Sequence, residues 1–355
     1  MKVEDLFTSM IDRRASHLHL VPGSPIMMRI NNQLVSMDSQ ILSPQDTRAF
    51  SEAIMNEPLR DEFEEQLEVD FSFSVPGLSR FRVNVFKQRG SVAVVISTNP
   101  PAAPTIEELG IPETVKNIVH DSTSGLIIVG GPKHCGKSNT LAALVNFILE
   151  QRTCQVITLE DPIDFLHKNK RGIICQREIG NDVLSYADAF KALKHQSADV
   201  VVVGNLDTYE VVENVLRLAS SGTLVLASCT AANVQGILEK IIDMSPAHLN
   251  QSVRNQIATG LRAIIGQVLL KKYSGDRLLP AFELLVASPQ FKSLARENKL
   301  HQVQALMAAS ARDYGMQTQE MSLRYLVKKN LITMEEALRT TSRPEEFRKI
   351  MSMPY

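Results

Sequence analysis

Two features that direct a chain into a membrane are missing from this sequence. Uninterrupted apolar runs are short, as at residues 200–203, whereas a membrane-spanning helix needs about 20 apolar residues. The first fourteen residues, MKVEDLFTSMIDRR, mix acidic and basic side chains with apolar ones and lack the apolar core of a signal peptide. We therefore expect a chain without a transmembrane segment.

Cysteine and net charge are also scarce. The four cysteines, at positions 135, 154, 175 and 229, form no C-x-x-C pair, which is typical of reduced thiols in the cytosol. Lysine and arginine total 38 against 39 aspartates and glutamates, so the chain has no overall attraction to nucleic acid or anionic lipid. These absences predict a cytoplasmic protein that does not bind nucleic acid directly.

The 355 residues, of which 44% are hydrophobic, suffice for two domains. Residues 1–98 contain an amphipathic helix over 2–14, short strands near 17–21 and 26–30, and one helical stretch over 44–67 capped by Ser43. Three runs of alternating polarity follow, at 69–75, 80–86 and 91–97. The pattern predicts a small α+β domain with an antiparallel sheet.

The pattern changes beyond residues 99–110, a stretch with three prolines near its start that we interpret as a linker. Apolar strands near 125–130, 155–159, 200–204 and 223–229 alternate with helices, which is typical of a mostly parallel sheet. We expect this α/β core to span 111–290 and a helical region to span 291–355.

The segment GGPKHCGKSNT, residues 130–140, satisfies the phosphate-loop spacing G-x-x-x-x-G-K-[ST] between an expected strand and an expected helix. In such a loop, Lys137 reaches the β- and γ-phosphates of ATP and Ser138 ligates Mg²⁺. The context favours this over a glycine turn with an incidental lysine. The nucleotide-binding residues we expect are Gly131, Pro132, Lys133, His134, Cys135, Gly136, Lys137, Ser138 and Asn139.

Carboxylates cluster in ITLEDPIDF, residues 157–165, where an expected strand ends. Ligands of parallel sheets bind at this edge, so Glu160 and Asp164 are catalytic candidates and Asp161 is a candidate for holding Mg²⁺. The alternative is a solvated turn whose acids cap a helix.

Asn205 stands at the end of the next expected strand, where a nucleoside triphosphatase usually places an acid. An amide cannot act as a base. Asp207 could compensate, but a helix-capping role is the simpler interpretation. We expect Cys229 to be a core residue, and the pair His17 and His19 lacks the further ligands of a metal site.

Arg80 and Arg82 share one face of an expected strand, and apolar residues take the other. They form either a solvated sheet face or fingers that reach the nucleotide of a neighbouring subunit.

Taken together, these motifs resemble the PilT-like retraction ATPases of type IV pili, within the secretion-ATPase superfamily. The similarity runs over nearly the whole chain, through GLIIVGGPKHCGKSNTLAALVNFI, VITLEDPIDFLH, CQREIG, LRAIIGQVLLKK and YGMQTQEMSL among others. It implies a PAS-like N-terminal domain, a RecA-like core that binds ATP and Mg²⁺, and a cytoplasmic hexamer. Such rings act on the platform protein of the pilus in the inner membrane.

The same resemblance exposes departures. The family's Thr-Gly-Ser loop interior is Lys133-His134-Cys135, its second glutamate of the acidic run is Asp164, and its next glutamate is Asn205. An arginine is replaced at Asp207 and another at Ser97, and the two histidines of the family's His box are Thr223 and Thr230.

These replacements spare the residues that hold phosphates and remove those that position water or sense the nucleotide. We expect a divergent ATPase with weak turnover, or a non-hydrolysing paralogue that assembles with or regulates an active family member. A metabolic P-loop kinase is a more distant interpretation. Cys135, beside a helix N-terminus, could have a lowered pKa and act as a redox switch.

Overall fold

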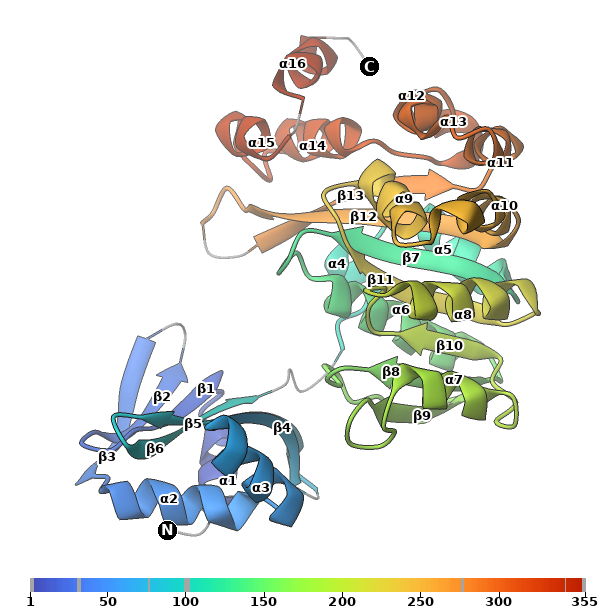
Figure 1. The fold of residues 1–355 in the computed structure, drawn as a ribbon. Helices are drawn as coiled ribbons and strands as arrows, with labels where there is room; N and C mark the ends of the chain where they lie inside the picture. Colours follow the sequence, from blue (N-terminus) through green and yellow to red (C-terminus); the bar gives the residue numbers. More distant parts are fainter. Residues whose placement is uncertain are drawn as a thin grey trace. The chain divides into compact units, whose positions relative to one another are not determined.

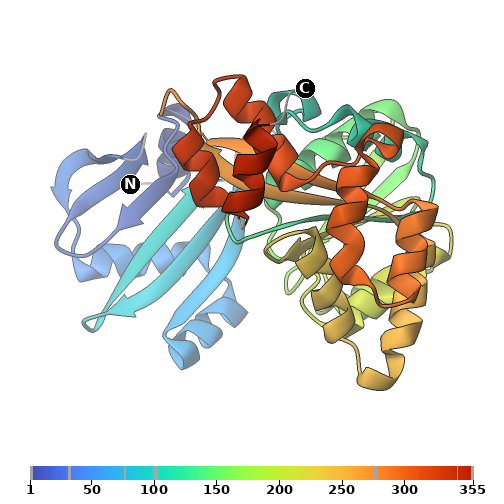
Figure 2. The same ribbon diagram turned by 90° about the horizontal axis from the view of Figure 1, so that it is seen from above.

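The computed structural model describes residues 3–30, 33–75, 77–98, 103–275, 278–341 and 343–352. The chain divides near residue 102 into two compact units, each of which is described by itself; residues 164–166 group with the first unit. The ribbon in Figures 1 and 2 follows the chain through both.

The first unit is built on a six-stranded antiparallel sheet with the strand order β3-β2-β1-β6-β5-β4. Alternation in β5 puts Phe81, Val83 and Val85 in the core and the arginines on the other face, as the sequence predicts. The elements are α1 (Val3–Asp12), β1 (His17–Leu20), β2 (Pro25–Ile30), β3 (Gln33–Ile41), α2 (Pro44–Ile54), α3 (Glu57–Gln66), β4 (Glu68–Val75), β5 (Ser79–Gln88) and β6 (Ser91–Thr98).

The single helix predicted over 44–67 is wrong, because the structure has two helices there. The predicted cap is confirmed: Ser43 accepts a hydrogen bond from the Asp46 backbone N–H and forms a capping box with that residue. The backbone of Met55 is extended, which ends α2. The Asn56 side chain caps α3 by accepting a hydrogen bond from the Leu59 N–H. Pro58 lies in the first turn of α3, where its missing N–H costs nothing, so a new helix begins.

The second unit is built on a seven-stranded sheet with the order β13-β12-β7-β11-β10-β8-β9, in which only β13 runs antiparallel to its neighbour. The strands are β7 (Gly125–Gly131), β8 (Gln155–Glu160), β9 (Ile173–Glu178), β10 (Val200–Val203), β11 (Leu224–Thr230), β12 (Leu261–Lys271) and β13 (Leu278–Val286).

Helices cover both faces of this sheet, as the continuous apolar runs of its strands require (Figure 1). In β7, Leu126 and Ile128 pack in the cluster that includes α8 (Tyr209–Ser220), α9 (Val234–Asp243) and α10 (Asn250–Gly260). Ile127 and Val129 pack on the opposite face with α4 (Ile106–Leu109), α5 (Glu113–Asp121) and α6 (Lys137–Gln151). Residues 99–110 were expected to be a linker, but α4 lies within this stretch. Residues 99–102 fall outside the described residues.

Three strands of this sheet, β9, β12 and β13, were not predicted from the sequence. β9 is a polar edge strand, and its CQRE stretch carries no apolar alternation. β12 has eleven residues and is buried along most of its length, so its periodicity does not distinguish a strand from a buried helix.

From Pro289 onward the described chain forms helices, as predicted. α14 (Gln319–Lys328), α15 (Met334–Thr340) and α16 (Pro344–Ser352) share an apolar cluster with β12 and β13. The others are α11 (Pro289–Arg296), α12 (Val303–Ala309) and α13 (Ala311–Tyr314).

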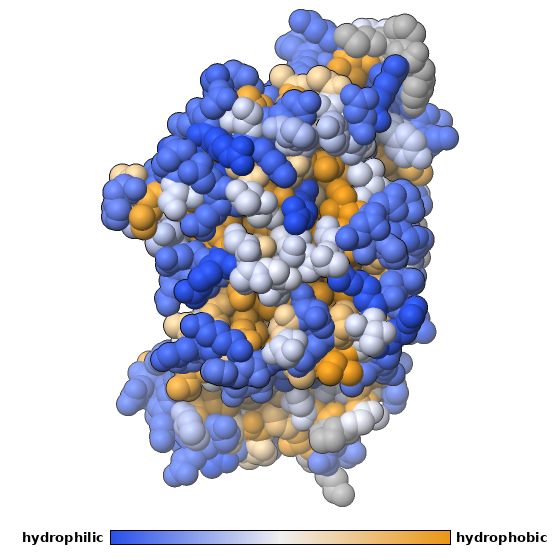
Figure 3. All heavy atoms as spheres, turned by 90° about the vertical axis from the view of Figure 1, so that its right-hand side faces the viewer, coloured by the Kyte–Doolittle hydropathy of each residue, from blue (hydrophilic) through white to orange (hydrophobic). Residues whose placement is uncertain are grey.

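Among the described residues, no helix is long and apolar enough to cross a membrane. Hydrophilic residues cover most of the face shown in Figure 3, and the apolar ones appear there in separate small groups. This surface agrees with the short apolar runs of the sequence.

A buried carboxylate joins the sheet to a helix start in this unit. Glu283 of β13 is 7% exposed, and its Oε2 accepts a hydrogen bond of 2.9 Å from the Val234 N–H at the beginning of α9. Burial raises the pKa of Glu283 to about 7; the Val234 hydrogen bond and the charge of Arg343 oppose the rise, and the charge of Glu320 adds to it. Between about pH 4.5 and pH 7, Glu283 is therefore protonated in the folded protein and ionised in the unfolded chain.

This proton gives the free energy of unfolding a pH dependence. Between the unfolded pKa of about 4.5 and the folded pKa of about 7, the contribution of Glu283 to stability falls as pH rises, by up to about 1.4 kcal/mol per pH unit. Glu283→Gln removes the titration, so we expect the variant to gain stability relative to wild type on going from pH 5 to 7.5 in guanidinium unfolding. The exposed Glu335→Gln on α15 is the control. A difference that does not change with pH would contradict the assignment.

Candidate functional site

Parallel strand pairing brings four segments to one edge of the second sheet. β11 pairs with β7 so that Thr230 lies opposite Gly131, and β10 pairs with both β8 and β11. The carboxyl ends of these strands lead into the phosphate loop, the acidic run, Asn205 and Thr230. The sequence predicted each segment at a strand end, and the register places them at a common edge.

The phosphate loop has the backbone that its glycines permit. Gly131 and Gly136 have φ of +153° and +88°, and a Cβ at Gly131 would lie 2.2 Å from the Gln267 carbonyl oxygen. Lys137 folds back over the loop, where its Nζ donates to the carbonyl oxygens of Pro132 at 2.9 Å and Gly131 at 3.3 Å. Ser138 is exposed in the first turn of α6.

The unusual interior of the loop changes its backbone and its thiol. His134 has φ of +61°, a left-handed conformation that costs an L-residue about 1–2 kcal/mol compared with glycine. Cys135 is 4% exposed, and burial raises the pKa of its thiol, although the nearby Lys137 opposes the rise. The expectation of a lowered pKa at Cys135 is wrong, because burial outweighs the neighbouring charge.

Gln267 of β12 makes hydrogen bonds to the phosphate loop and to Thr140 of α6. Its role at the site was not predicted from the sequence. Its Nε2 donates to the Cys135 carbonyl oxygen at 2.7 Å, and its Oε1 accepts from the Thr140 hydroxyl at 2.5 Å. The side chain is buried, with 4% exposed. A glutamine within the apolar stretch LRAIIGQVLLK was the available signal, since buried amides need hydrogen-bond partners.

In the acidic run, Glu160 is the carboxylate most firmly held by its neighbours. Its Oε1 accepts from the Thr158 hydroxyl at 2.5 Å and from the Gln176 amide at 3.4 Å. Asp161 and Asp164 are exposed, and the peptide bond between Asp161 and Pro162 is cis. No helix begins between residues 161 and 185, all of which the structure describes, so the alternative that these acids cap a helix is wrong.

A second carboxylate, Glu178 at the end of β9, holds the loop that follows Glu160. It is 3% exposed, and its Oε2 accepts from the Ile163 N–H at 2.9 Å. In the sequence, the CQREIG segment carries only the family resemblance and predicts no role for Glu178. The burial that marks it as a positioning residue comes from the packing of β9 on β8.

Asn205 faces Asp207 at the end of β10. Its Nδ2 donates to Asp207 Oδ2, while its buried Oδ1 receives no hydrogen bond from the described residues. The capping role expected for Asp207 is wrong, because Thr208 caps α8 through the Val211 N–H. Asp207 instead accepts from Lys240 Nζ at 3.4 Å, and the same ammonium group donates to the Thr230 carbonyl oxygen at 3.2 Å.

Tyr186, at the start of α7 (Tyr186–Leu193), is affected by the charges of acids from this edge. Burial raises the pKa of its hydroxyl to about 12, and the charges of Asp161, Asp207 and Glu160 add to the rise. Acids from two different strand ends thus act on one side chain. The arrangement forms an acidic edge beside the phosphate loop, a place where a metal-bound polyphosphate can be held.

Cys229, the residue before Thr230 in β11, is fully buried, as predicted. The remaining candidates belong to the first unit. His17 and His19 stack their rings at 6.1 Å, and no group of three or more potential metal-ligating side chains occurs among the described residues. In the first unit, the Arg82 Nε donates to both carboxylate oxygens of Asp70, at 3.1 and 3.0 Å. The role of Arg80 and Arg82 at a neighbouring subunit's nucleotide stays a prediction.

Comparison with known proteins agrees with this geometry. Residues 2–276 match the family model described as "Type II/IV secretion system protein". The chain is 35% identical to the type IV pilus retraction ATPase PilT of Pseudomonas aeruginosa over 98% of this chain and all of that protein. It is 32% identical to the type IV pilus ATPase PilU of the same organism, over 99% of this chain and 92% of PilU.

A solved structure, that of the pilus retraction motor PilT with bound ADP, superposes with a TM-score of 0.91 at 37% identity and covers 98% of this chain and 99% of its own. The second unit accordingly has the RecA-like fold of secretion ATPases. The chain belongs to the type II/IV secretion system family and, within it, to the PilT- and PilU-like ATPases of type IV pili.

Proposed function

We propose that this chain is an ATP-binding subunit of the type IV pilus retraction motor and that it hydrolyses ATP slowly. The single observation that carries the proposal is the contrast within one sheet edge. The phosphate loop keeps its glycine geometry and Lys137, whereas β10 ends in the amide of Asn205. The solved PilT relative carries ADP, which supports a nucleotide as the ligand of the same loop here.

Binding of the polyphosphate follows from the residues of the loop. Lys137 lies over the loop and exchanges its contacts with the Gly131 and Pro132 carbonyls for the β- and γ-phosphates. The N-terminus of α6 adds backbone N–H groups and the positive end of the helix dipole. Gln267 holds the Cys135 carbonyl in place, so the cradle is fixed before the ligand arrives.

The residues also fit a magnesium ion. Ser138 offers a hydroxyl oxygen, and Asp161 offers an exposed carboxylate whose charge raises the pKa of Tyr186, as the charges of Asp207 and Glu160 do. Hard oxygen ligands of this kind, together with phosphate oxygens, are what Mg²⁺ prefers. Bound there, the ion would neutralise charge on the phosphates. Ser138 and Asp161 would hold it.

Slow hydrolysis follows from the acids that remain. Glu160 is held by Thr158 and Gln176 and is the carboxylate best placed to orient a water molecule, with Asp164 as the second candidate. Asn205 cannot accept a proton, and the carboxylate of Asp207 is engaged by Asn205 and Lys240. Losing one group that stabilises charge or orients water typically costs about 10²–10³-fold in rate.

By family membership, we further propose a cytoplasmic hexameric ring that acts peripherally on the inner-membrane platform protein of the pilus. The ring contains this chain alone or together with an active paralogue. The alternative function, a non-hydrolysing paralogue that regulates an active ATPase, is favoured by the same Asn205, because a subunit that binds ATP without turnover can still complete a ring.

Lys137→Ala should weaken ATP binding by about 10- to 100-fold, because it removes a charge-assisted contact to the phosphates. A fluorescent ATP analogue measures the affinity. Lys133→Ala is the matched control: residue 133 would bind phosphate through its backbone N–H, which alanine keeps, and its side chain is exposed, so we expect a change of less than about threefold. Equal losses in both variants would mean that the loop contributes only general positive charge.

Wild-type turnover should lie at least about 100-fold below that of a family member with a complete set of catalytic acids. Restoring Asn205→Glu and Asp164→Glu together should raise the single-turnover rate, whereas Asn205→Gln, which keeps the amide, should not. A wild-type rate typical of a motor, abolished by Lys137→Ala, would refute slow hydrolysis.

Co-assembly separates the two functions. Mixed with a purified active PilT-like protein from the same cell, this chain should appear with it in six-membered rings by native mass spectrometry. If the chain regulates the active protein, the ATPase rate per active subunit should change with the mixing ratio. Rings of each protein alone, with unchanged rates, would exclude a mixed ring.

A further inference from the structure

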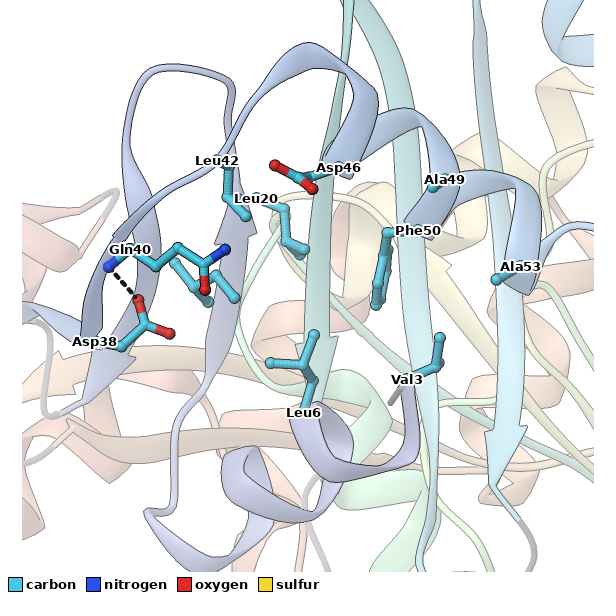
Figure 4. Close-up of a pocket in the computed structure, with 11 residues that line it drawn as sticks. Val3, Leu6, Leu20, Asp38, Gln40, Leu42, Asp46, Ala49, Phe50 and Ala53 are labelled. Atoms are coloured by element: carbon cyan, nitrogen blue, oxygen red, sulfur yellow. Dashed lines mark hydrogen bonds between the residues drawn. The ribbon is translucent and has the colours of Figure 1, made fainter. Parts of the chain in front are cut away.

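The first unit contains a cavity of about 270 Å³ that is lined by residues between Val3 and Ala53 (Figure 4). Leu6 of α1, Leu20 of β1 and Phe50 of α2 turn their side chains toward it. Asp38 and Gln40 of β3 line its other side. Residues of α1, β1, β2, β3 and α2 therefore line an open space that has both apolar and polar walls.

The sequence of α2 leaves this space open. One side of α2 lines the cavity with Ala49, Phe50 and Ala53. Ala49 and Ala53 are four residues apart, on the same side of the helix, and their small side chains fill little of the space. The start of α2 is fixed, since the Asp46 carboxylate accepts from the Ser43 N–H at 2.8 Å and from its hydroxyl at 2.7 Å. The helix therefore cannot readily slide to close the gap.

The polar border comes from an irregularity in β3, the edge strand. Pro25 pairs with Ile41 and Met27 pairs with Ser36, so four residues of β3 loop out of register between them. Asp38 and Gln40 belong to this bulge. The Gln40 N–H donates to Asp38 Oδ1 at 3.0 Å, while Oδ2 of the same carboxylate receives no hydrogen bond from the described residues. The bulge thus presents an acceptor with negative charge beside the cavity.

We propose that this cavity is a binding site for a small organic cation with an apolar body, such as an alkylammonium. The apolar walls favour a hydrocarbon chain, and Asp38 favours a cationic head with N–H donors. None of the described lining residues is a lysine or an arginine, whereas both Asp38 and Asp46 are acids, so nucleotides and fatty-acid carboxylates are disfavoured. The site is chemically distinct from the phosphate loop, and the inference does not depend on the proposed function.

Saturation-transfer NMR on the full chain tests the proposal with n-alkylammonium ions from butyl to octyl. Each added methylene should tighten binding about fourfold until the cavity is full. Hexanoate should bind at least about tenfold more weakly than hexylammonium. No detectable hexylammonium binding at millimolar concentration, or equal binding of the two ions, would overturn the proposal.

Variants locate the binding. Ala49→Leu and Ala53→Leu fill the cavity from α2 and should each weaken hexylammonium binding by at least about tenfold. Ala308→Leu adds the same bulk at an exposed position of α12 and should leave it unchanged. Asp38→Asn should bring hexylammonium to within about threefold of hexanol. Two cavity-filling variants are used because one of them could fail to fold. Thermal melting followed by circular dichroism would reveal such a failure. Unchanged binding in a folded Ala49→Leu or Ala53→Leu protein would place the ligand elsewhere and refute the site.

Discussion

The position of β7 between β11 and β12 is the constraint on which the second unit depends. β7 is buried along its whole length, and its hydrogen bonds to both neighbours fix where Gly130 and Gly131 leave the sheet. At Gly131 the neighbour is backbone, since a Cβ there would lie 2.2 Å from the Gln267 carbonyl oxygen. The same sheet also sets the order in which the phosphate loop, the end of β10 and the acidic run follow one another along its edge.

Within that frame, polar side chains from other strands hold the parts of the site. Gln267 reaches the loop from β12, and Glu178 reaches the backbone after Pro162 from β9. Both are nearly fully buried, and a buried polar group is tolerated only when its hydrogen bonds are satisfied. Their contacts preorganise the site. The hydrogen bond from Gln267 also helps to hold the phosphate loop, in which His134 has a strained left-handed conformation.

The departures from the family are unevenly distributed over the site. The phosphate loop keeps its glycines, Lys137 and Ser138, although residues 133–135 differ. At the end of β10, Asp207 bonds to both Asn205 and Lys240. The Asn205 amide and the Lys240 ammonium group both donate hydrogen bonds to the Asp207 carboxylate and so balance its charge. They also withdraw that carboxylate from chemistry. This arrangement is the observation behind the proposal of nucleotide binding with slow hydrolysis.

The sequence by itself determined the strands that carry the site, the phosphate loop, the acids after β8 and the amide after β10, because each has a local signature in spacing or residue type. It also determined the antiparallel first unit, through strict alternation in β5. Only the tertiary structure decided the break between α2 and α3, the strands β9, β12 and β13, the raised pKa of Cys135, and the partners of Asp207. These depend on burial and on residues distant in the chain, such as Gln267 below the loop and Lys240 beside Asp207. Local pattern carries no information about which distant side chain will remove a group from water, and that removal sets both pKa and hydrogen bonding.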